Sequence, residues 1–361
     1  MNKVIERVLI IGSALIVTVF IFFGLYTLNS SSNETLVIVQ EAEMEEEEME
    51  EAEEMSSGEG RIQEEVLETI VTFTINTQDF SYPEKSAEMM TRLLALHEQY
   101  DIPLSISFTH PMIDYYSQEQ SELWHQLSES PLISFGYHIR PPLPYHSNTP
   151  HRPEIKLLPE EQLQNLIRQY ETHGLDLETG RSTEEAGGFG ELVALLGDRF
   201  YTVGVSVDRR LGTVLQVYAD LGATFFAGHV GQMWLGKSVG PLHVRPEQEE
   251  IKAFQYTDED PRVILDQAIE QADRQEGVPT FINVKMHDND FFAEQSAWTA
   301  VYLSEKSRRL GAPFDLSQVS ALLSAEEQES VWVFYEGLLR AVAEDETVKT
   351  MTVAETYELI K

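Results

Sequence analysis

Residues 66–360 alternate short apolar runs with longer amphipathic segments, and this alternation restricts the possible folds more than any other feature of the chain. The first apolar run, from Ile70 to Ile75, is typical of a short buried strand, and residues 83–100 carry apolar side chains at helical spacing. About six or seven such strand–helix units follow one another. This order predicts a parallel sheet covered by helices, closed into a barrel, with an open doubly wound sheet as the alternative.

Two segments carry the signature of a capping box, in which a serine and a glutamate three residues later satisfy the first amides of a helix. Ser81 and Glu84 precede the helix predicted at residues 83–100. Ser324 and Glu327 stand in the same relation to the helix predicted at residues 324–343. Both helices are therefore predicted to begin at these residues.

The N-terminal segment predicts a membrane anchor. Residues 8–28 contain no charged side chain, and 21 helical residues cover roughly the 30 Å of a bilayer core. Lys3 and Arg7 precede the segment, and the charged residues that follow it are all acidic for dozens of positions. This charge difference places the rest of the chain outside the cytoplasm. The apolar run is long for a cleaved signal peptide and lacks a clear cleavage site, so residues 1–28 are predicted to be an uncleaved signal anchor in the cell membrane.

The next segment, residues 29–60, is predicted to be a disordered acidic stalk, since residues 41–54 include ten glutamates. The first 60 residues hold 13 acidic and 2 basic residues, so residues 61–361 still carry 25 of the 36 net negative charges. Such a surface repels nucleic acid, which we exclude as a partner. The chain has no cysteine, so disulfides and cysteine-based zinc sites are excluded as well.

Ionisable side chains gather just after the predicted strands. In a parallel barrel these strand ends converge on one face, where Asp and His together could bind a divalent metal with an open coordination position. Several of these residues also have a structural alternative. Asp79 could cap a turn, and His110 and Asp208 could cap helices. His146 and His151 could be surface residues of a proline-rich loop. The residues that follow the strands are Asp79, His110, His138, Asp208, His287 and Asp288.

The motifs resemble those of the polysaccharide deacetylase (NodB-homology) superfamily, in an uncharacterised divergent branch. Thr72-Phe73 begins a strand that ends in Gln78-Asp79, where the family has an Asp pair made of a base and a metal ligand. His138 fits the first histidine of the second motif, and Pro142 stands where the second would fall. The resemblance implies a deformed (β/α) barrel of about seven parallel strands over residues 61–361.

The resemblance also implies the roles of individual side chains. Asp79, His138 and, at a different spacing, His146 would hold a divalent metal, for which zinc is expected. The run from Val284 to Asp288 matches the last motif, whose histidine is the general acid of the family, so His287 and Asp288 are expected to be catalytic. Arg140 is expected to orient a carboxylate partner or to contact substrate.

These observations predict a membrane-anchored extracytoplasmic carbohydrate hydrolase. It would use the metal to remove acetyl groups, through C–N or ester cleavage, from a polysaccharide or cell-wall glycan. Gln78 and Pro142 keep open a second interpretation, a non-catalytic carbohydrate-binding relative. A third is a glycoside hydrolase that pairs Asp79 with Asp288 or Asp290.

Overall fold

The computed structural model describes residues 68–146, 149, 155, 157–197, 199, 201–204, 210–227, 238–274, 277–303 and 310–360. The predicted anchor and stalk, residues 1–28 and 29–60, lie outside the described residues. The described helices include none with both the length and the apolarity needed to cross a membrane. Residues 66–361 form one compact unit.

The central strand, β1 (Thr69–Thr77), is buried along its whole length. Its successive side chains point to opposite faces of the sheet. Phe73 points outward, where its ring makes edge contacts with His97 and Tyr335 on two covering helices. Thr72 and Thr74 point to the other face, and both donate hydrogen bonds to Asn283 Oδ1 of the neighbouring strand, at 3.1 and 3.0 Å.

One sheet of ten strands runs through the domain in the order β10-β11-β1-β2-β3-β6-β7-β9-β8, with β12 also paired to β1. Every pairing on this path is parallel except that between β8 and β9. A separate antiparallel hairpin, β4–β5, was not predicted. Besides β1, the strands are β2 (Leu104–Phe108), β3 (Ile133–His138), β4 (His173–Asp176), β5 (Arg181–Ala186), β6 (Tyr201–Gly204), β7 (Phe225–Ala227), β8 (Ser238–Val239), β9 (Leu242–Val244), β10 (Glu249–Lys252), β11 (Thr280–His287) and β12 (Val348–Thr350).

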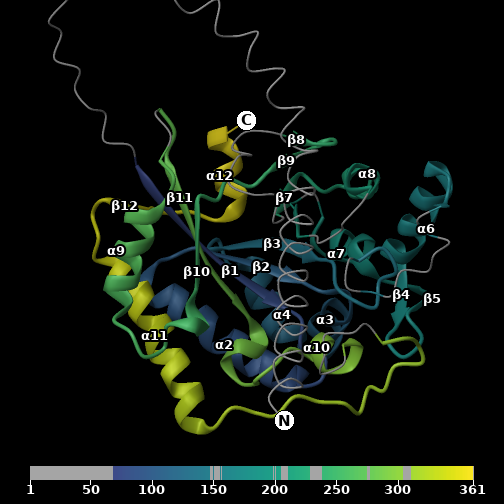
Figure 1. Ribbon diagram of the computed structural model, residues 1–361, viewed down its shortest axis with the longest axis horizontal. Helices are drawn as coiled ribbons and strands as arrows, with labels where there is room; N and C mark the ends of the chain where they lie inside the picture. Colours follow the sequence, from purple (N-terminus) through teal and green to yellow (C-terminus); the bar gives the residue numbers. More distant parts are fainter. Residues whose placement is uncertain are drawn as a thin grey trace, which may run out of the picture. The chain divides into compact units, whose positions relative to one another are not determined.

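Helices surround the outer face of this sheet (Figure 1). Successive neighbours in the layer pack together: α9 with α11, α11 with α2, α2 with α4, α3 with α7, α7 with α6, and α6 with α8. The α-helices are α2 (Pro83–Tyr100), α3 (His110–Asp114), α4 (Ser121–Glu129), α6 (Glu160–Thr172), α7 (Gly188–Leu196), α8 (Leu211–Asp220), α9 (Pro261–Gln271), α10 (Ala297–Tyr302), α11 (Ala325–Ala343) and α12 (Val353–Ile360), with a π-helix at Tyr115–Glu119 and 3-10 turns at Ala253–Gln255 and Asp288–Phe291.

The sheet is strongly curved. Side chains from β1, β2, β3, β6, β7 and β11 line a single pocket on its inner face, which requires the strands to bend around it. The described residues contain no pairing between β10 and β8, so the hydrogen-bonded path itself stays open. The prediction of a mostly parallel, barrel-like α/β domain is confirmed, while the expected number of about seven strands is too small.

Helix α12 covers the inner face near the start of the strands. The backbone N–H of Val353 donates a hydrogen bond to Ser105 Oγ on β2 at 2.9 Å. The ring of Tyr357 packs edge-on against Phe225 and His243, each at 5.4 Å. Because this end of the sheet is covered, the opposite end, where the strands finish, is the end left for a site.

The two predicted capping boxes have different outcomes. Ser324 Oγ accepts from the N–H of Glu327 at 3.2 Å, and the Glu327 carboxylate accepts from the N–H of Ser324, so the box at α11 is confirmed. At α2 the N-cap is Tyr82, which makes no side-chain cap, so the predicted box of Ser81 and Glu84 is wrong. Asp79 accepts from the amides of Ser81 and Tyr82 instead.

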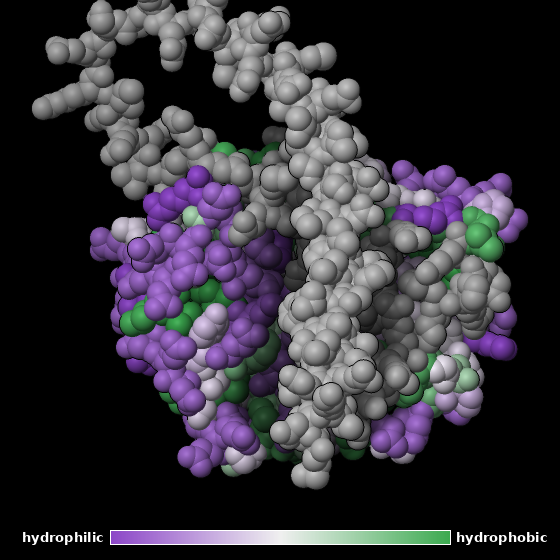
Figure 2. Space-filling model, viewed as in Figure 1, coloured by the Kyte–Doolittle hydropathy of each residue, from purple (hydrophilic) through white to green (hydrophobic). Residues whose placement is uncertain are grey.

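The surface over α9 and α11 is mainly polar. Figure 2 shows that the face over α9 and α11 is mainly hydrophilic, with a smaller hydrophobic patch. The first turn of α11 contributes the acidic residues Glu326 and Glu327.

Candidate functional site

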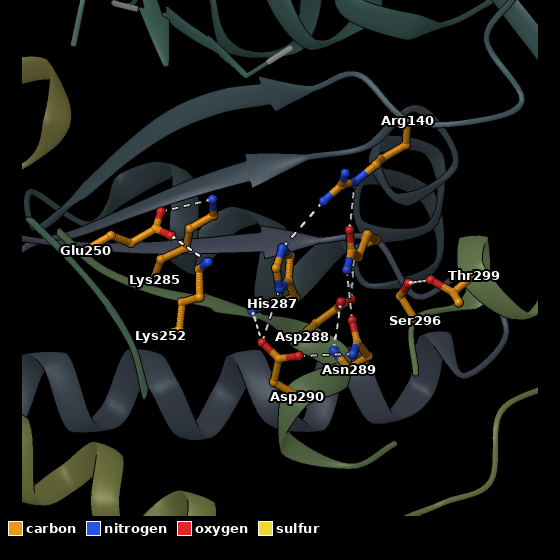
Figure 3. Close-up of polar contacts among 11 residues, drawn as sticks. Arg140, Glu250, Lys252, Lys285, His287, Asp288, Asn289, Asp290, Ser296 and Thr299 are labelled. Atoms are coloured by element: carbon orange, nitrogen blue, oxygen red, sulfur yellow. Dashed lines mark hydrogen bonds and ion pairs between the residues drawn. The ribbon is translucent and has the colours of Figure 1, made fainter. Parts of the chain in front are cut away.

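The candidate site forms where the ends of β1 and β11 and the loop after β3 meet. The two strands pair in parallel, with Asn76 opposite His287, so the residues that follow each strand lie side by side. Figure 3 shows Arg140 reaching this point from the loop after β3, toward His287 and the Asp288–Asp290 turn. The expected convergence of polar side chains at the strand ends is therefore present for these elements.

Asp288 is an anchor beneath the site. Its side chain is fully buried, and Oδ2 accepts hydrogen bonds from the backbone N–H groups of Gln78 and Asp79, both at 3.0 Å, and from Ser86 Oγ at 2.8 Å. Burial raises the pKa of this carboxyl group. Asp288 thus ties the end of β11 to the end of β1 and to α2, and it positions the neighbouring residues rather than facing the opening.

Asp79 is also fully buried. Its Oδ1 accepts from the amides of Ser81 and Tyr82 at 3.2 and 3.1 Å, and Oδ2 accepts from the amide of Ala297 at 3.1 Å. Burial, with the nearby charge of Asp288, raises the pKa of Asp79 to about 7. The turn-cap alternative for Asp79 therefore matches the structure, and the same burial leaves no room for a sugar between Asp79 and Asp288.

Gln78 joins two elements of the site through its side-chain amide. Its Nε2 donates to Asn289 Oδ1 at 2.8 Å, and its Oε1 accepts from Arg140 Nε at 2.8 Å. The side chain is only 3% exposed. Gln78 thus fixes the direction of the Arg140 side chain, a role that a carboxylate base facing solvent would not perform.

His287 lies between an acid and a cation. Asp290 Oδ2 accepts from the backbone N–H of His287 at 2.8 Å and lies 3.1 Å from the ring Nδ1, while the ring Nε2 lies 3.4 Å from an Arg140 guanidinium nitrogen (Figure 3). Because a guanidinium can only donate, Nε2 is an acceptor here, and the ring proton is assigned to Nδ1. The His287 side chain is 21% exposed, so this lone pair is at the edge of the site.

The Arg140 side chain also contacts an aromatic ring. Its guanidinium carbon lies 5.1 Å from the centre of the Trp298 ring, within the range of a cation–π contact. Burial lowers the pKa of Arg140 to about 10, offset in part by the charges of Asp288 and Asp290. The group is therefore still a cation at neutral pH.

Of the two histidines expected to bind metal, His138 lies near enough to Arg140 and His287 for their charges to act on it, but its ring contacts a backbone carbonyl. His138 Nδ1 is 3.1 Å from the carbonyl oxygen of Gly204, and burial together with Arg140 lowers its pKa well below the usual range, so the ring is neutral. His146 is fully buried. His110 is buried as well, with Nε2 2.9 Å from the carbonyl of His173, and it does not cap a helix, since the N-cap of α3 is Thr109.

A metal ion would need donor atoms on these residues whose lone pairs are not already used. Both oxygens of Asp79 already accept backbone hydrogen bonds, and His138 Nδ1 faces a carbonyl. Within the described ranges, no three His, Asp or Glu side chains come together in a group able to hold a metal ion. These donors do not fit a zinc ion, and zinc binding stays a prediction. Two further candidates, His151 and Asp208, lie outside the described residues.

An open groove of about 520 Å³ adjoins the site. Asp290 forms part of its wall, next to Glu294, Glu327, Phe254 and Val331. This volume falls in the range of small-molecule sites. The groove therefore offers room for a ligand beside the residue that orients His287.

Sequence reasoning missed three contributors to the site. Ser86 lies inside α2, and Trp298 lies in α10, more than 150 residues from the Arg140 that it contacts. Neither has a local signal that marks it. Asn289 directly follows His287-Asp288, so its place in the motif could have drawn attention to it.

Comparison with known proteins gives distant structural likenesses alone. A 4-alpha-glucanotransferase from Thermococcus litoralis aligns at 10% identity and a TM-score of 0.49, over 81% of this chain and 40% of that one. A CE4 family pseudoenzyme from Bacillus anthracis aligns at 12% identity and a TM-score of 0.34, over 81% and 66% of the two chains. A mutant of it with restored enzymatic activity gives 12% identity, a TM-score of 0.36, and 81% and 68% coverage.

No family model matches the chain, and no curated protein matches it either. The structural neighbours thus include a CE4 family pseudoenzyme and a 4-alpha-glucanotransferase, at identities that are too low to assign this chain to a family.

Proposed function

We propose that the chain is a carbohydrate-active hydrolase that removes acyl groups from a polysaccharide or cell-wall glycan. The observation that supports this most directly is the arrangement of His287 between Asp290 and Arg140 at the open end of the sheet. A base oriented by a carboxylate, beside a fixed cation, is what acyl hydrolysis requires. The neighbouring groove of about 520 Å³ would hold the sugar that carries the acyl group.

The proposed reaction uses His287 as the base. When substrate binds, the Arg140 Nη2–H turns from Nε2 to the substrate carbonyl, and Nε2 then takes a proton from water while the water oxygen bonds to the acyl carbon. The Arg140 guanidinium stabilises the negative oxygen that develops on the former carbonyl. The tetrahedral intermediate then breaks its bond to the sugar oxygen or nitrogen, and the proton on Nε2 passes to that leaving atom. Asp290 keeps the other ring nitrogen protonated throughout.

Two further residues act by positioning. Gln78 holds Arg140 through its Nε, which leaves the terminal nitrogens directed at His287. Asp288 joins the strand ends below them.

Metal binding by Asp79, His138 and His146 is a separate expectation, and no step above depends on it. Metal analysis of the purified full chain tests it, because a stoichiometric divalent ion that is lost in His138→Ala would establish the site.

The hydrolase proposal is tested by acetate release from acetylated oligosaccharides, with either N- or O-acetyl groups. His287→Ala should reduce the rate by about 10²- to 10⁴-fold, the usual contribution of a general base. His125→Ala is the matched control, since His125 is an exposed histidine on α4, and it should leave the rate unchanged. Equal rates in the wild type and in His287→Ala would contradict the proposal.

A non-catalytic glycan-binding protein is the second candidate. Gln78 and Asp79, at the positions that resemble the family's Asp pair, favour this candidate. The polar atoms of both side chains already form hydrogen bonds within the protein. This candidate predicts saturable binding of the same oligosaccharides with no acetate released by the wild type. The glycoside hydrolase alternative has less support, since Asp79 and Asp288 are both fully buried.

We also propose that residues 8–28 anchor the chain in the cell membrane with the remainder outside. The chain has no cysteine, so a single Ser57→Cys substitution gives one labelling position. A membrane-impermeant maleimide should label this cysteine in intact cells. Labelling only after lysis would contradict the proposed orientation.

A further inference from the structure

The inner face of the curved sheet holds a second pocket, apart from the His287–Asp290 pair. Two cations line it: Lys285 on β11 and Arg245, which directly follows β9. Hydroxyl groups from Ser107 on β2 and Thr202 on β6 add to the lining. Among the described residues that line this pocket none is acidic, although the chain carries a net charge of −36.

Both cations are well shielded from solvent, with side-chain exposures of 14% for Lys285 and 11% for Arg245. Each has a carboxylate partner that lies outside the pocket lining. Lys285 Nζ is 3.1 Å from Glu250, which it shares with Lys252, and Arg245 pairs with Glu247 (Figure 3 shows the first group). The residues that line the pocket thus include two cations, and the carboxylates that pair with them do not line it.

Neighbouring charges act on both cations. Burial lowers the pKa of Arg245 to about 10, offset in part by the charge of Glu250. Burial also lowers the pKa of Lys285, where the charge of Glu250 raises it and that of Arg245 lowers it. Glu250 thus already compensates both cations in part, and an anion in the pocket would add charge-assisted hydrogen bonds, which are the strong ones.

We propose that this pocket binds a carboxylate. Its volume of about 40 Å³ is roughly that of three water-sized groups, since one water needs about 10–15 Å³. A carboxylate group fits this space, and a sugar ring that carries it would have to lie outside the pocket. The inference rests on Lys285, Arg245 and the hydroxyl lining alone, so it holds or fails independently of the proposed hydrolase activity.

The carboxylate has two possible sources, a free acid such as acetate or the carboxylate of a uronic acid unit in a glycan. Titrations of the full chain with sodium acetate and with glucuronic acid, at constant ionic strength and followed by ligand-observed NMR, distinguish them. Saturable binding of acetate points to the free acid, and binding of glucuronic acid alone points to the glycan. Either result supports the site, and the absence of saturable binding by both overturns it.

Charge-removing variants locate the binding. Lys285→Gln and Arg245→Gln should each weaken the affinity for the carboxylate by about tenfold or more, because each removes a charge-assisted donor. Lys252→Gln is the matched control: Lys252 pairs with the same Glu250 but is 47% exposed and does not line the pocket. Equal weakening in Lys252→Gln and Lys285→Gln would overturn the assignment.

Two measurements cover the case in which a charge variant does not fold. Thr202→Val removes a lining hydroxyl without a change of charge and should also weaken binding. In the wild type, acetate should raise the midpoint of thermal unfolding more than an equal concentration of chloride does, as expected for a ligand that binds the folded state. Inorganic phosphate is larger, and a higher affinity for phosphate than for either carboxylate would contradict the proposed size.

Discussion

Asp290 Oδ2 lies 3.1 Å from Nδ1 of His287 and also accepts the backbone N–H of the same residue at 2.8 Å. The carboxylate thus fixes both the ring orientation and the position of the ring proton. Nε2 is left as the acceptor, next to the Arg140 guanidinium. In the proposed reaction, the direction in which His287 can accept a proton depends on this one contact.

The first prediction concerns Asp290→Asn. An asparagine amide can donate to Nδ1, which would favour the tautomer with the proton on Nε2 and so block the proposed base. We expect the rate of acetate release to fall by about 10²- to 10⁴-fold. Glu294→Gln, a neighbouring acid in the same groove, is the control and should have little effect on the chemical step.

A second readout separates this effect from a general loss of structure. In ¹⁵N NMR spectra the two ring nitrogens of a neutral histidine give different shifts according to which one is protonated. His287 should change tautomer in Asp290→Asn and not in Glu294→Gln. An unchanged tautomer together with a normal rate would contradict the assigned role of Asp290.

The next prediction concerns Gln78→Ala and the stability of the domain. This change leaves Arg140 Nε and Asn289 Oδ1 without their partner in a buried environment. The free energy of unfolding should fall by about 2 kcal/mol, the typical cost of unsatisfied buried polar groups. Urea denaturation measures the change. Gln318→Ala, whose side chain bonds only to the exposed Asp315, should change stability by less than about 0.5 kcal/mol.

The pH dependence of stability should reflect Asp79. Below the ordinary pKa of 3.8 the group is protonated in both states, while between about pH 4 and 7 only the folded chain retains the proton. The contribution of Asp79 to the free energy of unfolding is therefore present at low pH and is lost as the pH rises through about 7. A shift of this size corresponds to at most about 4 kcal/mol.

Comparison with Asp79→Asn isolates the contribution of Asp79 ionisation to the free energy of unfolding, because asparagine does not titrate. The variant keeps the Oδ1 acceptor for Ser81 and Tyr82 but loses the Oδ2 acceptor for Ala297. It should be less stable than the wild type at about pH 5, and the difference should narrow toward about pH 8. A difference in unfolding free energy that is the same at both pH values would argue against a raised pKa.

The elements of this fold could be predicted well where local pattern decides them. β1 and β11 carry apolar residues at every second position, and α2 has the bounds that its apolar spacing predicts. The strands β8 to β10 could not be predicted, since they lie within residues 228–258, which are rich in Gly and Pro. Strands of two to four residues give too little periodicity to detect.

The site was predictable in position but not in its contacts. Asp79 and His287-Asp288 do lie at adjacent strand ends, as their place in the sequence indicates. What each side chain does there depends on distant partners: Asp79 accepts from the amide of Ala297, and Asp288 from Ser86. No spacing rule links residues 200 positions apart, so a buried anchor and an exposed ligand look the same in the sequence.

The two predicted capping boxes give the last prediction. Ser324→Ala removes the acceptor for the N–H of Glu327 at the start of α11, and the free energy of unfolding should fall by about 1 kcal/mol. Ser81→Ala tests the box that does not form: Ser81 Oγ is buried and has no hydrogen-bond partner among the described residues, so the change should be neutral or slightly stabilising. The difference arises because the N-cap of α2 is Tyr82 and not Ser81, whose hydroxyl caps no amide of the helix. Chemical denaturation of the two variants side by side measures it, and equal losses of stability would contradict the assigned caps.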